Sequence, residues 1–224
     1  QQVITNAGLF NRALRKEGIL SCGKHFPGYG PAECDPHEFL PVITKSREEM
    51  EKSELLPYSA LLPELDSVMT CHSNYTAYDP DRGRWPASLS HNIVTKLLRH
   101  QYAFDGLAMT DDLDMGAILN EVTFEQAIQE AVRAGNDLVM ICHRVEMVEL
   151  ARQHLEGVEE PALHDALVRI EKTKKRLVAP DKFDLDRFAA INRDIWQLRV
   201  DTLGEEAAKK LSVEDGKRSP VELY

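Results

Sequence analysis

The sequence has no excess of basic residues and no long apolar segment. Its 224 residues include 27 Lys and Arg against 37 Asp and Glu, a formal net charge of −10 at pH 7. A chain of this charge repels nucleic-acid phosphates and anionic membrane surfaces, so we expect no nucleic-acid partner and no membrane partner. No apolar run reaches the length of about 20 residues that a helix needs to cross a bilayer. No secretory signal opens the sequence either.

Cysteine is scarce, and its spacing matches no zinc-binding pattern. Three of the four cysteines, Cys22, Cys71 and Cys142, lie in apolar, strand-like segments. This placement is typical of buried free thiols in a reducing compartment, so we expect a cytoplasmic protein without disulfide bonds. The sequence also has no Walker loop, no dinucleotide-binding fingerprint and no histidines and carboxylates at metal-ligand spacing. We therefore expect neither a cofactor nor a metal.

Short apolar segments rich in Val, Ile, Leu and Met recur along the chain, and helical patterns separate them. The four segments are residues 18–22, 67–71, 106–109 and 137–142. They are apolar throughout instead of alternating with polar residues. This pattern predicts a parallel sheet that helices cover on its faces.

Two of the helices carry start signals. Thr123 and Gln126 form a capping box before an amphipathic pattern that we expect to stop at Gly135. Ser46 and Glu49 frame the start of another helix.

Polar, titratable side chains follow each apolar segment. They are Lys24 and His25 after the first, His72 after the second, Asp111 and Asp112 after the third, and His143 after the fourth. Chemistry at the carboxyl ends of successive parallel strands is typical of a (β/α)8 TIM barrel, which is the fold class we predict. A doubly wound sheet is the rival, but it usually concentrates its site near one switch point.

Only half of such a barrel is expected in this chain. A complete barrel needs eight strands and about 250 residues, whereas four strand segments precede residue 145. We predict the C-terminal half of a barrel, with four βα units over residues 1–157, and a helical tail with a polar C-terminus over residues 158–224. Since the sequence lacks an initiator Met and opens on a helical pattern, we expect the upstream half to be removed or carried elsewhere.

The first candidate site is the segment Lys-His-Phe-Pro-Gly-Tyr-Gly at residues 24–30. Adjacent strand residues point to opposite faces, so Lys24 and His25 reach one ligand only where the strand breaks, and the Pro-Gly pair supplies a break. Both side chains can then donate hydrogen bonds to sugar hydroxyls or to another polar ligand. The structural alternative is a solvated Lys and a His bonded to nearby backbone.

The next candidate is the Asp-Pro-His tripeptide that ends the same loop. The Asp35 carboxylate lies two residues from the His37 imidazole and can hold one tautomer of that ring. A histidine has an ordinary pKa near 6.5, so it can donate and then accept a proton near neutral pH. Taken alone, the tripeptide indicates a turn aspartate before proline and a surface histidine. Its attachment to the glycine-rich loop favours a functional role instead.

The third candidate is the acidic pair after the third segment. A carboxylate at the carboxyl end of a barrel strand can attack an anomeric carbon and form a covalent glycosyl intermediate. We expect Asp111, the first residue beyond the strand, to take that role and Asp112 to cap the next helix or support its neighbour. His72, at an equivalent strand end, either lines the pocket or supports it by hydrogen bonding.

These segments resemble a known family. Residues 24–30 and 35–37 are similar to the Lys-His-Phe-Pro-Gly-His-Gly and Asp-Ser-His pattern of glycoside hydrolase family 3 β-N-acetylhexosaminidases, which include bacterial cytosolic enzymes of peptidoglycan recycling. Three more segments fit the family in the expected order: residues 68–72, 86–90 and 106–115.

The resemblance implies a retaining β-N-acetylglucosaminidase that releases terminal N-acetylglucosamine from peptidoglycan-derived saccharides. Asp111 would be the nucleophile, and His37 the general acid/base with Asp35 as its partner. Lys24 and His25 would bind the sugar, with His72 as a further substrate-binding candidate.

Two departures and two alternatives accompany this resemblance. Tyr29 replaces the loop His of the family, and Pro36 replaces a Ser, which restricts Asp35 to extended backbone. One alternative is an inactive half-barrel, or a subunit that needs the missing N-terminal half. The other is a β-glucosidase or glycoside phosphorylase of the same family.

Overall fold

The computed structural model describes residues 1–30, 32–180 and 182–210, so the polar end expected over residues 212–224 lies outside the described part. The chain divides into two compact units, Gln1–Leu177 and Val178–Tyr224. The first unit contains the sheet and the candidate site. The second contains two helices, α8 (Leu185–Leu203) and α9 (Glu205–Ala208).

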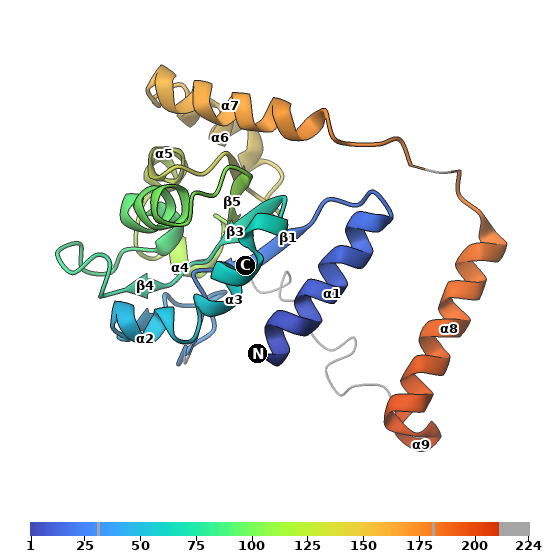
Figure 1. Ribbon diagram of the computed structural model, residues 1–224. Coiled ribbons are helices and arrows are strands. Elements are labelled where there is room, and N and C mark those ends of the chain that lie inside the picture. Colours follow the sequence, from blue (N-terminus) through green and yellow to red (C-terminus); the bar gives the residue numbers. More distant parts are fainter. Residues whose placement is uncertain (31, 181, 211–224) are drawn as a thin grey trace. The chain divides into compact units, whose positions relative to one another are not determined.

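The first unit is built on a four-stranded, all-parallel sheet (Figure 1). In spatial order its strands are β1 (Cys22–Phe26), β3 (Ser67–Thr70), β5 (Leu107–Asp112) and β6 (Leu138–Met140). A separate, two-stranded parallel sheet consists of β2 (Val42–Ile43) and β4 (Asn74–Tyr75). The spatial order follows the sequence order, as in a barrel and unlike a doubly wound sheet. The predicted partial barrel is therefore confirmed.

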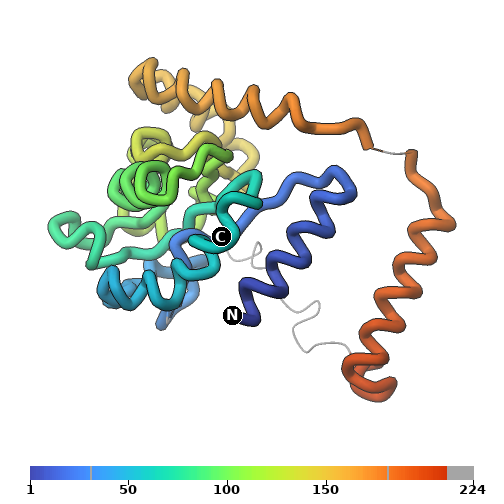
Figure 2. The backbone as a smooth tube through the Cα atoms, in the orientation of Figure 1, coloured from blue at the N-terminus to red at the C-terminus, as the bar shows by residue number. Residues whose placement is uncertain are grey.

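Helices precede and follow the strands, as the backbone tube of Figure 2 also traces. They are α1 (Gln2–Lys16), α2 (Arg47–Glu51), α3 (Leu56–Leu61), η1 (Leu62–Glu64), η2 (Ala87–Leu89), η3 (Asn92–Gln101), α4 (Gly116–Leu119), α5 (Phe124–Ala134), α6 (Met147–Leu155) and α7 (Glu160–Lys174). Both predicted helix starts are confirmed, and each of them has a capping box. Ser46 and Glu49 cap α2, and Thr123 and Gln126 cap α5, which ends at Gly135 with a left-handed φ of 111°.

The prediction for the first strand was wrong by several residues. It was expected over residues 18–22, but Gly18 has a φ of 75° and terminates α1, and the strand begins at Cys22. Lys24 and His25 therefore lie within β1. The pairing register with β3 shifts between Lys24 and Phe26, so the break that re-aims these side chains falls at His25 and not at the following Pro-Gly pair.

The core fixes the sheet between its helices. Phe26, Val68 and Ala108 from three neighbouring strands are completely buried and pack with residues of η3 such as Ile93. A second cluster joins Leu113, just beyond β5, to the apolar face of α5. Burial of side chains this size contributes about 1.5–3 kcal/mol each, so the strand ends are held firmly.

Helix α7 belongs to the first unit. The fully buried carboxylate of Asp137 accepts hydrogen bonds from Arg99 at 2.6 Å and from Arg169 of α7 at 2.7 Å. Arg176, just beyond α7, pairs with the buried Asp66. The compact unit therefore extends beyond residue 157, the predicted end of the barrel portion, because these buried carboxylates tie α7 to the sheet.

The cysteines are free thiols, but the expectation of burial holds only for Cys71. Cys22 and Cys142 are exposed, since β1 and β6 are the outer strands of the described sheet. Within the described ranges, no helix combines the length and the apolar character needed to cross a membrane.

Candidate active site

The candidate residues gather at the carboxyl edge of the sheet. Lys24 on β1 pairs with Met69 on β3, and Thr70 pairs with Thr110 on β5. Because parallel strands end at the same edge, Lys24 and Asp111 are placed two strands apart along one rim.

A histidine and a carboxylate meet on this rim. His25 Nε2 lies 3.4 Å from Asp111 Oδ2, and both side chains are about a quarter exposed, at 25% and 21%. Burial lowers the pKa of His25, and the charges of Lys24 and His37 lower it further. The charge of Asp111 acts in the opposite direction but does not outweigh them. His25 is therefore neutral at pH 7 and can act as an N–H donor beside the Asp111 carboxyl group.

The Asp35 and His37 side chains form the expected pair. His37 Nδ1 lies 2.6 Å from Asp35 Oδ1, which also accepts the His37 backbone N–H at 2.9 Å. That backbone N–H is the main reason why the pKa of Asp35 is lowered. With Nδ1 directed at the carboxylate, a proton exchanged with a ligand would pass through Nε2.

The loop that carries His37 is docked on the segment after β5. The N–H of Gly116 donates to the His37 carbonyl at 3.0 Å, and the N–H of Ala117 donates to the Pro36 carbonyl at 3.2 Å. Only glycine permits this approach, because a Cβ at position 116 would lie 2.5 Å from the Glu38 oxygen and 2.8 Å from the His37 oxygen. The loop is thus fastened five residues beyond Asp111.

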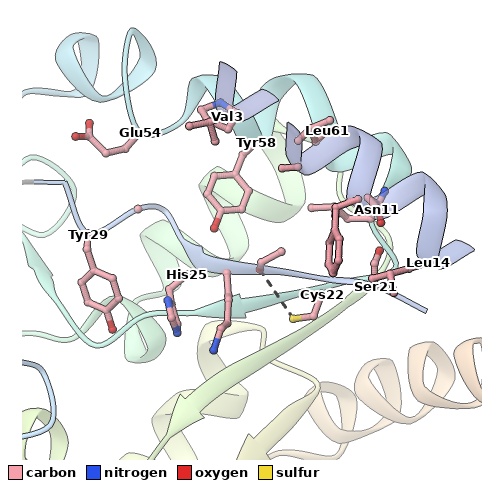
Figure 3. A pocket seen from close by; sticks show the side chains of 17 residues that line it. Val3, Asn11, Leu14, Ser21, Cys22, His25, Tyr29, Glu54, Tyr58 and Leu61 are labelled. Atoms are coloured by element: carbon pink, nitrogen blue, oxygen red, sulfur yellow. Dashed lines mark hydrogen bonds between the residues drawn. The ribbon is translucent and has the colours of Figure 1, made fainter. Parts of the chain in front are cut away.

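Tyr29 completes the wall next to His25. The two rings make an edge contact with centroids 5.2 Å apart, and Figure 3 shows both side chains below the loop that carries Tyr29. Burial raises the pKa of Tyr29, and its hydroxyl completes no hydrogen bond with a residue of the described ranges, although the backbone of His72 approaches it.

A cavity of about 500 Å³ opens beside this rim (Figure 3). Lys24, His25 and Tyr29 line one end of it, and apolar side chains of α1 and α3 line the other. This volume suits a small ligand. Asp111 and His37 are not among its lining residues, so the cavity is a chamber on the β1 side of the rim.

Of the two roles expected for His72, its contacts agree with support by hydrogen bonding and not with binding of a sugar. Its ring is completely buried, with Nδ1 2.8 Å from Ser88 Oγ and Nε2 2.8 Å from the Asp112 carbonyl. Both ring nitrogens are engaged, so His72 has no donor to offer a sugar. It supports the end of β5 instead.

One cluster behind the rim was not foreseen as a unit. The side chains of Asp112, Asp114 and His143 are close enough to share a cation, with their nearest ligand atoms within 4.8 Å of one another. However, His143 Nδ1 lies 2.6 Å from one carboxylate and 3.0 Å from the other, so the imidazole already occupies the space between them. A sequence signal existed in the Asp-x-Asp spacing after β5, but nothing paired it with His143.

Comparison with known proteins identifies the family. A family model described as the glycosyl hydrolase family 3 N terminal domain matches residues 1–173. The chain belongs to glycosyl hydrolase family 3.

Relatives within family 3 agree with this placement. A protein described as "Beta-hexosaminidase" from Pseudomonas aeruginosa (strain LESB58) is 35% identical over 153 residues, which cover 68% of this chain and 45% of that protein. The structure of a family 3 β-N-acetylglucosaminidase from Paenibacillus sp. str. FPU-7 is similar, with a TM-score of 0.72 and 31% identity over 78% of this chain and 35% of that chain. "Beta-glucoside phosphorylase BglX" gives a TM-score of 0.71 at 25% identity, over 78% and 33%. The chain spans about half the length of the curated relative it matches.

Among the candidates for a family 3 site, the fold brings together three strand-end residues and one loop pair. Lys24, His25 and Asp111 share the sheet edge, and the Asp35–His37 pair is fastened beside that edge through Gly116. His72 is buried next to this edge, with both ring nitrogens engaged by other residues.

Proposed function

We propose that this chain carries the catalytic groups of a retaining β-N-acetylglucosaminidase that acts on peptidoglycan-derived saccharides. Asp111 is the nucleophile, His37 is the general acid/base, and Asp35 orients the His37 ring. Lys24 and His25 donate hydrogen bonds to the non-reducing sugar. The names of the hexosaminidase relatives support this substrate class.

The observation that carries the proposal is the arrangement of two titratable pairs on one rim. The His25–Asp111 pair, at 3.4 Å, places a carboxyl oxygen of Asp111 next to a neutral imidazole. The Asp35–His37 pair, at 2.6 Å, lies in a loop that bonds to the chain just after Asp111. Two such groups at a strand end and a facing loop suit double displacement at an anomeric carbon.

In the first step, an Asp111 oxygen attacks C1 while His37 Nε2–H protonates the leaving glycosidic oxygen. The C1–O bond to the aglycone breaks, and a glycosyl ester forms on Asp111. In the second step, the neutral His37 takes a proton from water, and the resulting hydroxide attacks C1. The ester bond breaks, N-acetylglucosamine leaves with its configuration retained, and His37 is protonated again.

Labelling tests this assignment directly. A slow fluorinated N-acetylglucosaminyl substrate should add the mass of one sugar to a peptide that contains Asp111, as read by mass spectrometry. Asp111→Asn should remove the label and abolish cleavage of an aryl N-acetylglucosaminide. Wild-type turnover in Asp111→Asn, or a label on another carboxylate, refutes the nucleophile assignment.

A second candidate is a half-barrel that works only together with further polypeptide. In the described part of the chain, β1 and β6 are the outer strands and no strand lies beyond them. Such edges favour pairing with another chain segment. Size-exclusion chromatography and activity, measured with this chain alone and with an upstream half-barrel added, separate the cases. A monomeric, active chain eliminates this second candidate.

The similarity to a phosphorylase favours one more comparison of substrates. Initial rates on aryl glucoside and aryl N-acetylglucosaminide, with and without phosphate, distinguish hydrolysis of the N-acetylated sugar from β-glucosidase or phosphorylase activity. We also propose a cytoplasmic location, because the cysteines of the chain are free thiols.

A further inference from the structure

The cluster behind Asp111 joins the ends of two strands. Asp112 is 5% exposed at its side chain and Asp114 is fully buried, and both carboxylates face His143, which follows β6. The pairing register of β5 with β6 shifts between Met109 and Asp112, so the regular ladder lapses just before the candidate nucleophile.

Side chains continue the connection between the two strands beyond the last paired residues, Asp112 and Met140. Asp112 Oδ1 accepts the backbone N–H of Cys142 at 3.1 Å. Asp114 Oδ2 accepts the backbone N–H groups of His143 at 3.2 Å and Arg144 at 3.0 Å. Each carboxylate thus holds the chain after β6 with one oxygen and faces the His143 ring with the other.

A proton must lie in this cluster. His143 Nδ1 is 2.6 Å from Asp112 Oδ2 and 3.0 Å from Asp114 Oδ1, with hydrogen-bond geometry toward Asp114. A bare ring nitrogen and a bare carboxylate oxygen would repel at such distances, because both carry lone pairs. Burial raises the pKa of Asp112. Burial also acts to raise the pKa of Asp114, but the backbone N–H of Arg144 and the His143 ring outweigh it and lower that pKa, which is consistent with a shared proton.

The cluster acts on Asp111 through the backbone of Asp112. Asp111 Oδ1 accepts the N–H of Asp112 at 2.9 Å, which leaves Oδ2 to face His25. The Asp112 carbonyl accepts a hydrogen bond from His72, and its side chain is held by the Cys142 backbone N–H, with Oδ2 beside the His143 ring. The orientation of the Asp111 carboxylate therefore depends on how firmly Asp112 is fixed.

We propose that His143 is a positioning residue for Asp111, acting through the two carboxylates that it bridges. This inference rests on the proposed function. It predicts that loss of the bridge lets the end of β5 move relative to β6, so that the Asp111 carboxylate no longer faces C1 in one geometry. Such misplacement lowers the rate of the chemical step more than substrate binding.

Two substitutions at one position test the bridge. His143→Phe keeps a ring but removes both nitrogens, and should lower kcat at least tenfold per folded molecule while KM changes less than threefold. His143→Gln presents two N–H donors to the carboxylates and should recover most of the lost kcat. His164→Phe, on the exposed face of α7, is the matched control and should leave kcat unchanged. The amide resonance of Asp111 should shift in His143→Phe and stay near its wild-type position in His143→Gln.

An unchanged kcat per folded molecule in His143→Phe overturns the inference, as does a His143→Gln variant that is no better than His143→Phe. If His143→Phe does not fold, Asp114→Asn is tested in its place, because the amide oxygen can still accept the backbone N–H groups of residues 143 and 144. An unchanged kcat in Asp114→Asn also overturns the inference. Asp111→Asn is measured in parallel. If Asp111→Asn abolishes cleavage but His143→Phe does not change kcat, only this proposal is eliminated. If cleavage does not depend on Asp111, the proposed function is eliminated as well.

Discussion

Gly116 offers a specific perturbation of the candidate acid/base without touching it. In Gly116→Ala, the new Cβ would lie 2.5 Å from the Glu38 carbonyl oxygen and 2.8 Å from that of His37. Both contacts are with backbone, which cannot swing aside as the end of a side chain does. The loop that carries His37 must therefore move away from α4.

The size of the effect follows from the contacts that this movement breaks. The loop is held by the hydrogen bonds from Gly116 N–H to His37 and from Ala117 N–H to Pro36. Each contributes about 1 kcal/mol net, so losing both costs about 2 kcal/mol, or roughly a 30-fold fall in the equilibrium constant for docking of the loop. Alanine favours the helix by up to about 1 kcal/mol over glycine, so global stability should change much less than activity.

The assay is kcat/KM on an aryl N-acetylglucosaminide together with urea unfolding. We expect kcat/KM to fall roughly 30-fold, in line with the loss of docked loop. Gly157→Ala is the matched control, because its Cβ would meet the end of the Gln129 side chain, which can move. A Gly116→Ala variant with wild-type kcat/KM refutes the role of the docked loop.

The remaining predictions concern charge pairs and a cap. Asp137→Asn removes the fully buried charge between two arginines and should destabilise the protein by about 3–5 kcal/mol in urea unfolding. A loss below about 1 kcal/mol contradicts the stabilising role of these ion pairs. Asp35→Asn should lower kcat/KM about 100-fold or more, because the His37 ring loses the carboxylate that orients it; a wild-type pH–rate profile excludes that role. The pKa of Asp35 is lowered in the native state, so its ionised form makes a small contribution to stability above about pH 4. This contribution is lost as the pH falls below the native pKa. Unfolding measured over a series of acidic pH values should show the loss in wild type and not in Asp35→Asn. Thr123→Ala should cost about 1 kcal/mol, because the first turn of α5 loses its cap to the Gln126 N–H, and an unchanged midpoint in urea rejects this estimate.

The sequence predicted the strands and their order well, because buried parallel strands are apolar throughout and capped helices separate them. The start of β1 was missed. Residues 18–22 are as apolar as a strand, and only the left-handed Gly18 and the bond from Ser21 N–H to the Asp66 carboxylate delay the strand to Cys22. Those contacts join residues far apart in the chain, so local pattern does not reveal them.

The site was predicted in part for the same reason. Asp35 and His37 are two residues apart, so their pairing follows from local geometry. The roles of His72 and His143 depend on partners about 16 to 40 residues away, and nothing in the local sequence distinguishes a buried support from a ligand donor. His72 was consequently given a sugar-binding role that its buried ring cannot perform.

Chemical rescue with azide tests the central claim most directly, because the anomer that forms reports which side of the sugar lost its catalytic group. The Asp111→Ala substitution is made in whichever preparation is active, the chain alone or the chain with an upstream half-barrel. Added azide then replaces the missing nucleophile and should yield the α-glycosyl azide of N-acetylglucosamine from an activated aryl substrate. Azide added to His37→Ala should attack the glycosyl-Asp111 intermediate and yield the β-glycosyl azide. The same anomer from both variants, or the β-azide from Asp111→Ala, contradicts the assignment of these two groups to opposite faces of one glycosidic bond.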